Sequence, residues 1–186
     1  NDGYLDLFVS NLTEENELLI NDGHANFIKT DAGEVTSDIG HSKGIVFQDF
    51  DNDGDFDLFV SNGTPGSLED HFFYSGYGSG KFEKQSNFNL VKHGGQAGGS
   101  SSADINNDGQ MDLFITNWVD NANNKMFFKF SKNDHNWIQI EMRGKSSPST
   151  AYGARVSLHF KINGKSKIFS QHLASQSGYG RQNSPV

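Results

Sequence analysis

The 186-residue sequence contains no cysteine, so no disulfide can brace its fold. Extra stability must then come from a bound metal or from closure of the fold on itself. It also lacks any run near the about 20 apolar residues that a membrane-spanning helix needs, so we predict no membrane span. Positive charge is scarce, with 15 Lys and Arg against 23 Asp and Glu and a formal net charge of −8. This balance argues against nucleic acid as a partner and favours a bound cation.

The residues that are abundant favour short strands. The chain holds 16 Phe and 21 Gly, a composition more typical of many strands and turns than of long helices. The sequence begins at Asn1 without a Met or an apolar signal segment, and it ends abruptly at Val186. We therefore expect a fragment of an all-β protein whose targeting signals lie outside this segment.

An eight-residue pattern, Asn-Asp-Gly-x-x-Asp-Leu-Phe, occurs at residues 1–8, 52–59 and 107–114. With Asp2, Asp53 and Asp108 as markers, the offsets are 53 − 2 = 51 and 108 − 53 = 55 residues. This spacing is close to the length of one four-stranded propeller blade. The repeats therefore predict a partial β-propeller.

The second repeat predicts all four strands of such a blade. Residues 44–48 form a strand that enters the Asp-rich loop, residues 58–60 leave it, and residues 71–74 and 81–84 form an outer hairpin around a Gly-rich turn. Further outer strands are predicted at residues 17–20 and 26–29 in the first repeat and at residues 125–130 in the third.

The segment between the second and third repeats is rich in small residues. We interpret the Gly-rich run at residues 94–99 as a linker, and Ser100, Ser101 and Ser102 as small residues near the propeller axis.

The Asp-rich loop of the second repeat has the spacing of a calcium site. Carboxylates stand at loop positions 1, 3, 5 and 9, a glycine permits the bend at position 6, and position 7 offers its carbonyl oxygen. The predicted ligands are Asp49, Asp51, Asp53, Asp55 and Asp57. Two of these carboxylates about 4 Å apart repel each other by about 1 kcal/mol in water and by about 4 kcal/mol at an effective dielectric of about 20. An EF-hand is excluded, because position 12 holds Val60 instead of Glu.

The other two copies are poorer in carboxylates. In the third repeat an amide replaces one carboxylate, so we predict weaker calcium binding there. Its predicted ligands are Asp104, Asn106, Asp108, Gln110 and Asp112. The first repeat retains only Asp2 and Asp6, an incomplete set. The alternative is that these copies are ordinary Asp-Gly turns, but three in-register copies favour calcium.

Residues 49–58 resemble the FG-GAP/VCBS repeats of integrin-α-type propellers, and the resemblance extends over residues 1 to about 130. The remainder resembles the ASPIC/UnbV domain at residues 136–140, 152–156 and 177–183, without the His-Phe-Gly-Leu-Gly-like end of that family. The resemblance implies propeller repeats over residues 1–132 and a small, truncated C-terminal β domain over residues 133–186. It also implies a secreted or cell-surface protein.

No catalytic set is recognisable in the sequence. The seven histidines form no His-Glu-x-x-His motif, and no Gly-x-Ser-x-Gly elbow occurs. We therefore expect a non-catalytic, calcium-binding extracellular module that recognises a protein or a glycan. Two alternatives stay open: an accessory region of a larger secreted carbohydrate-active enzyme, or an adhesive surface-layer protein.

Overall fold

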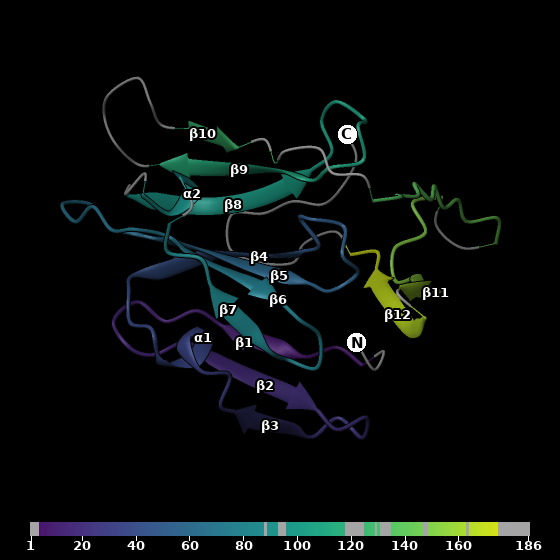
Figure 1. Cartoon of the computed structure of the whole chain (residues 1–186), viewed down its shortest axis with the longest axis horizontal. Coiled ribbons are helices and arrows are strands. Elements are labelled where there is room, and N and C mark those ends of the chain that lie inside the picture. Colours follow the sequence, from purple (N-terminus) through teal and green to yellow (C-terminus); the bar gives the residue numbers. More distant parts are fainter. Residues whose placement is uncertain are drawn as a thin grey trace.

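The computed structural model describes residues 4–87, 89–92, 96–117, 125–128, 130, 135–146, 149–162 and 164–174. These residues form short strands in four antiparallel sheets (Figure 1), which confirms the predicted all-β class. Helix is limited there to the single turns α1 (Glu34–Ser37) and α2 (Asn89–Lys92). Neither turn has the length or the apolar character to cross a membrane. The sheets of the described residues do not close into a ring.

The first sheet contains β1 (Leu7–Val9), β2 (Glu17–Asn21) and β3 (Phe27–Thr30) in sequential order. Ile20 lies opposite Ile28 across the hairpin that joins β2 to β3. Gly23 turns the hairpin with a φ of 84°, a left-handed conformation that favours glycine. The outer strands predicted for the first repeat are therefore confirmed.

The second sheet is a four-stranded meander of β4 (Ser42–Gln48), β5 (Asp57–Asn62), β6 (Phe72–Gly76) and β7 (Phe82–Lys84). It confirms all four strands predicted for the second repeat. Every residue of β5 is buried, because sheets cover this strand on both faces. The Asp-rich loop joins β4 to β5, and the residues at its two ends, Asp49 and Asp57, are buried.

The third sheet contains β8 (Ala97–Ala103), β9 (Asp112–Asn117) and β10 (Lys125–Phe128), with β9 in the centre. The predicted linker is wrong at Gly98 and Gly99, which are buried residues of β8. A small residue of β4, Gly44, lies close to β8. A Cβ atom on Gly44 would lie 2.7 Å from the backbone N of Ser100. Small side chains let two strands of neighbouring sheets approach each other.

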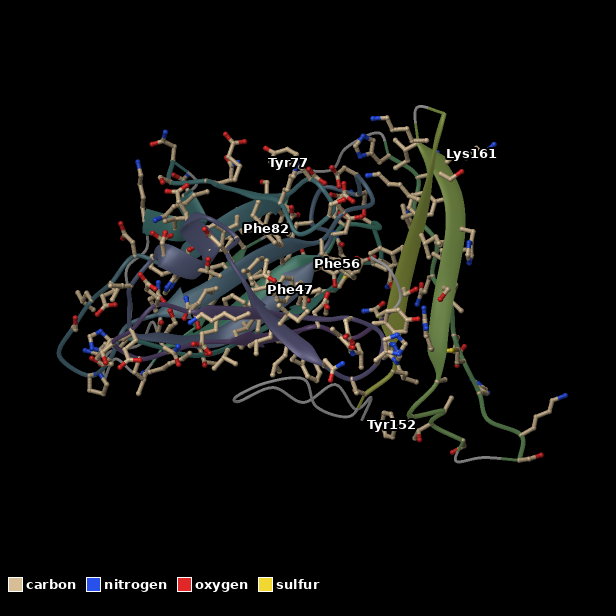
Figure 2. All side chains as sticks on the ribbon, turned by 90° about the horizontal axis from the view of Figure 1, so that it is seen from below. Phe47, Phe56, Tyr77, Phe82, Tyr152 and Lys161 are labelled. Carbon is tan, nitrogen blue, oxygen red and sulfur yellow. The ribbon has the colours of Figure 1, made fainter. Side chains whose placement is uncertain are left out.

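Two apolar clusters join the three sheets, which are stacked in chain order (Figure 1). The larger cluster lies between the second and third sheets and includes Phe50, Phe59 and Leu113. The smaller one surrounds Val60 and Tyr74, with Phe47 and Phe82 packed against it (Figure 2). The second sheet therefore lies between the other two, and its loop ends are held in place from both sides.

A separate hairpin of β11 (Arg155–Ile162) and β12 (Lys165–His172) lies along one side of the sheets (Figures 1 and 2). Half-buried and exposed residues alternate along β11, as expected for a strand with one covered face. Residues 135–146 contain neither helix nor strand. Residues 177–183, part of the C-terminal resemblance, lie outside the described residues.

Candidate metal-binding loops

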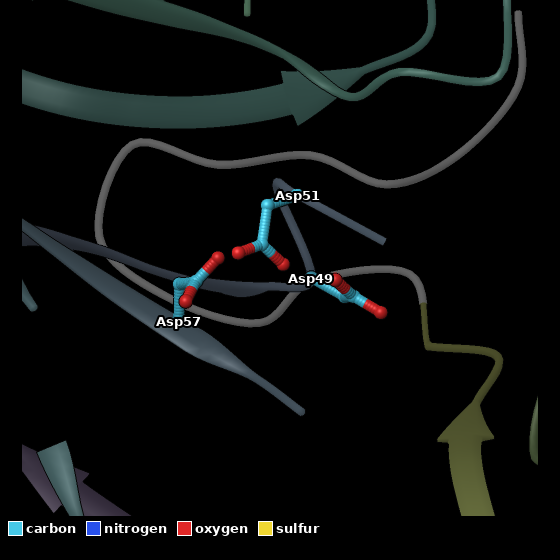
Figure 3. Close-up of side chains that lie close together, drawn as sticks. All are labelled: Asp49, Asp51 and Asp57. Atoms are coloured by element: carbon cyan, nitrogen blue, oxygen red, sulfur yellow. The ribbon is translucent and has the colours of Figure 1, made fainter. Parts of the chain in front are cut away.

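The loop at residues 49–57 brings three carboxylates together (Figure 3). Oxygen atoms of Asp49, Asp51 and Asp57 all lie within 4.8 Å of one another. The backbone folds tightly enough for this because Asn52 and Gly54 have φ values of 57° and 86°. Asp51 is exposed, whereas Asp49 and Asp57 expose only 8% and 3% of their surface. Two of the three converging carboxylates are thus shielded from water.

Backbone amides fix the two buried carboxylates. Asp49 accepts hydrogen bonds from the N–H groups of Asp53 and Gly54, at 3.1 Å and 2.9 Å. Asp57 accepts from Phe50 N at 2.9 Å and from Gly76 N, at the end of β6, at 3.0 Å. Because charge-assisted bonds of this kind are strong, the carboxylates are oriented before any ion arrives.

Burial raises the pKa of these acids. The pKa of Asp49 rises to about 6 and that of Asp57 to about 7, mainly because removal from water penalises the charged form. Repulsion from neighbouring carboxylates adds to both shifts, although the backbone hydrogen bonds act against them. The pKa of Asp53 is raised for the same main reason. A bound cation would relieve this penalty.

Asp53 and Asp55 have other partners. Asp53 Oδ1 accepts the backbone N–H of Asp55 at 2.8 Å. The Asp55 carboxylate accepts a hydrogen bond from Lys167 Nζ of β12, also at 2.8 Å. The group of three converging acids does not include either residue. Their ligand roles stay predictions, and for Asp55 the predicted ligand is in any case the backbone carbonyl.

The third loop repeats the local fold of the second. Asp104 accepts from Asp108 N at 3.1 Å and Gly109 N at 2.8 Å, and Asp112 Oδ2 accepts from Ile105 N at 3.2 Å. Gln110 N donates to Asp108 Oδ1 at 3.0 Å. Asp112 is 2% exposed, and its Oδ1 has no hydrogen-bond partner. The acids of the third loop nevertheless do not converge as those of the second loop do.

The remaining predicted ligands do not belong to the converging group. Asn106 is exposed, and its Nδ2 donates to Asp108 Oδ2 at 2.9 Å. Asp6 is also exposed and accepts the backbone N–H of Asn21 at 2.9 Å, so it fixes the position of β2. Asp2 lies outside the described residues. Within the described part of the chain, only the second loop brings three acidic side chains together.

The structure adds contacts around the two loops that the sequence did not predict. Asn52 Nδ2 donates to the carbonyl O of Gly109 over 3.0 Å, which joins the second loop to the third. His135 Nδ1 lies 2.8 Å from the carbonyl O of Asp51. Trp137 packs against Gly109 so closely that a Cβ there would lie 2.1 Å from its indole. No local signal in the sequence indicated these partners.

Comparison with protein-family models identifies an FG-GAP-like repeat over residues 1–60. The match includes the first sheet, β4, the second Asp loop and the start of β5. It therefore supports a β-rich, extracellular-type module in the part of the chain that holds the converging carboxylates. No curated protein matches the chain.

Proposed function

We propose that this chain is a calcium-stabilised, non-catalytic module of a secreted or cell-surface protein, and that it recognises an extracellular protein or glycan. The observation that carries the proposal is the convergence of Asp49, Asp51 and Asp57 within 4.8 Å, with two of the three buried. The FG-GAP-like match over residues 1–60 supports the extracellular setting.

The chemistry of the donors favours calcium over other metals. The second loop offers carboxylate and carbonyl oxygens, which suit a hard cation, and the converging group contains no His or Cys, which softer metals prefer. Calcium accepts six to eight oxygen ligands in flexible geometry, so carbonyls and water can complete the shell. Magnesium demands a stricter octahedron and keeps more of its water.

A structural role fits the position of the loop. Its two ends continue into β4 and β5, and its carboxylates are bonded to backbone amides, so an ion there would fasten one strand to the next. A metal that binds only the folded form stabilises it by about 2.7 kcal/mol when the free metal concentration is about 100 times the dissociation constant. This gain suits a chain without disulfides.

We propose a second, weaker site in the third loop. Its backbone pattern copies that of the second loop, and the buried Asp112 Oδ1 without a hydrogen-bond partner supports cation binding. Asn106 stands where the second loop has Asp51, which removes one negative charge. The charge count predicts the lower affinity.

Thermal unfolding in calcium and in chelator tests the metal-binding part of the proposal. We expect calcium to raise the melting temperature of the wild-type chain and Asp51→Asn to lose most of that rise. Asp51 is exposed, so the substitution removes ligand charge with little change in packing. Glu14→Gln, at an exposed acid outside the loops, is the control and should keep the full rise. Equal melting temperatures with and without calcium would exclude a stabilising ion.

Recognition requires a separate test. We propose screening the calcium-loaded chain against an array of glycans and a panel of extracellular-matrix proteins. Binding that disappears with chelator would support the proposal. Absence of binding to every member would count against recognition and leave the metal site as a purely structural feature.

A further inference from the structure

Charge is distributed very unevenly along the chain. All 23 Asp and Glu fall within residues 1–141, with 8 of the 15 Lys and Arg, so this part carries a formal charge of 8 − 23 = −15. Residues 142–186 contain the other seven Lys and Arg and no acid, which gives +7. The hairpin of β11 and β12 belongs to the basic part, and it lies beside the acidic loops (Figure 1).

One lysine of this hairpin contacts the second Asp loop directly. Lys167 Nζ lies 2.8 Å from Asp55 Oδ2 and 2.9 Å from the carbonyl O of Asp53. The side chains of Lys167 and Asp55 are only 25% and 13% exposed. A half-buried pair with an added backbone hydrogen bond is held in a defined geometry, unlike most surface ion pairs.

Apolar contacts cover the same loop. A Cβ atom on Gly54 would lie 2.9 Å from the ring of Phe160 and 3.2 Å from Ile162, so β11 packs directly on the turn of the loop. The rings of Phe56 and Phe169 have centroids 4.6 Å apart, so β12 also packs against the end of the loop. The hairpin and the second loop therefore share one interface.

The interface is specific to the second copy of the repeat. Loop position 7 is Asp55 there, whereas the third copy has Gln110 and the first has Tyr4. Only Asp55 can form an ion pair with a lysine. Because the Asp55 carboxylate is not one of the three that converge, it can bind Lys167 while the others bind an ion.

We propose that Lys167 is a positioning residue for the second Asp loop. With Asp55 it latches the hairpin of β11 and β12 onto the loop and holds the loop in the conformation in which its carboxylates converge. Hairpin docking and calcium binding then strengthen each other, since a coupling between two binding events is reciprocal. This inference rests on the proposed calcium site.

Charge alone predicts a different pattern of effects. If Lys167 acted only by repelling the ion, Lys167→Met would tighten calcium binding and Asp55→Asn would weaken it. The neutral double variant would then bind as the wild type does. If the ion pair between Lys167 and Asp55 holds the loop in place, the double variant should instead bind calcium more weakly. The loop would have lost this contact without any change in net charge.

Calorimetric titration of calcium into the full chain separates these accounts. We expect the double variant Lys167→Met with Asp55→Asn to raise the calcium dissociation constant about fivefold or more, within the usual range of coupling between sites. Lys161→Met, at an exposed position of β11, is the matched control and should not affect the affinity beyond a small charge effect. Lys167→Arg keeps both the positive charge and a donor for Asp55, so its affinity should stay close to that of the wild type. A double variant with wild-type affinity would overturn the proposal.

Amide hydrogen exchange tests whether calcium binding and hairpin docking are coupled. If Lys167 only stabilised the fold, calcium would not alter exchange in the hairpin. In the wild type, calcium should slow amide exchange in residues 155–172, and in the double variant this calcium effect should disappear while β4 and β5 still respond. If the wild type binds no calcium, the proposed metal site fails. If it binds calcium but exchange in residues 155–172 stays the same, the latch alone fails.

Discussion

Asn52 and Gly109 join the two Asp loops through a single hydrogen bond of 3.0 Å, from the Asn52 side chain to the Gly109 carbonyl. The residues are 57 positions apart and occupy neighbouring copies of the same motif. Asn52 is also in the left-handed region, with a φ of 57°, a conformation that asparagine tolerates better than most residues. One side chain therefore serves both the turn of its own loop and the contact with the next.

Replacement of Asn52 by glycine isolates this contact. Glycine keeps the left-handed backbone but removes the hydrogen bond, so we expect a loss of about 0.5–1.5 kcal/mol in unfolding free energy, measured by urea denaturation. Asn107→Gly is the matched control, because Asn107 has the same φ of 57° in the third loop and is exposed. Equal losses in the two variants would show that the contact between the loops contributes nothing.

The close approach of β4 and β8 predicts a second effect. A Cβ atom on Gly44 would lie 2.7 Å from the backbone N and the hydroxyl of Ser100, and equally close to the hydroxyl of Ser61. Gly44→Ala should therefore cost about 1–3 kcal/mol of unfolding free energy by overpacking. The loss should be the same in calcium and in chelator, since Gly44 lies within β4 and not in the loop that would hold the ion. A neutral substitution would show that these sheets are not packed so tightly.

The sequence predicted the features that depend on local patterns. Alternating and apolar runs located the four strands of the second sheet. The five ligands predicted between residues 49 and 57 include the three acids that converge, but the spacing did not separate these three from Asp53 and Asp55. It failed at Gly98 and Gly99, because a glycine-rich strand resembles a linker until its neighbour is known.

Contacts between distant segments could not be predicted in the same way. Lys167 lies 112 residues beyond Asp55, and a lysine in an alternating strand carries no signal for its partner. The same holds for His135 on the Asp51 carbonyl, 84 residues apart. Such contacts are decided by how the sheets and the hairpin pack, not by any local propensity.

A single substitution should strengthen the weaker site. Asn106 occupies position 3 of the third loop, where the second loop has Asp51, so Asn106→Asp restores the missing carboxylate. We expect a tighter dissociation constant at the third loop together with lower stability in chelator, because the added charge is repelled by Asp104 and Asp108. Calcium titration and urea denaturation in chelator measure the two effects. If affinity stays the same, position 3 of this loop does not face an ion.

The raised pKa values predict how stability depends on pH without metal. The pKa of Asp49 is about 6 and that of Asp57 about 7 in the folded chain, against about 3.9 when unfolded. Between the unfolded and the folded pKa values, the folded state binds more protons than the unfolded state. The two protonated carboxyls therefore make their full contribution to stability below about pH 4, and this contribution is lost as the pH rises to about 7. In chelator, the urea midpoint should therefore be higher at pH 5 than at pH 7.5.

Two comparisons check the origin of this pH effect. Calcium should remove it, because the ion replaces the protons on both carboxylates. The double variant Asp49→Asn with Asp57→Asn should show a flatter profile in chelator. If the wild-type midpoint rises between pH 5 and pH 7.5 in chelator, the two carboxylates are not destabilised by burial in the folded state.

Direct measurement of bound calcium tests the central claim. Chelator-treated chain, dialysed to equilibrium against labelled calcium, should bind two ions, one tighter than the other. Asp49→Asn should abolish the tighter site and leave the weaker one, since Asp49 belongs to the second loop alone. Absence of bound calcium, or two unchanged sites in Asp49→Asn, would contradict the account.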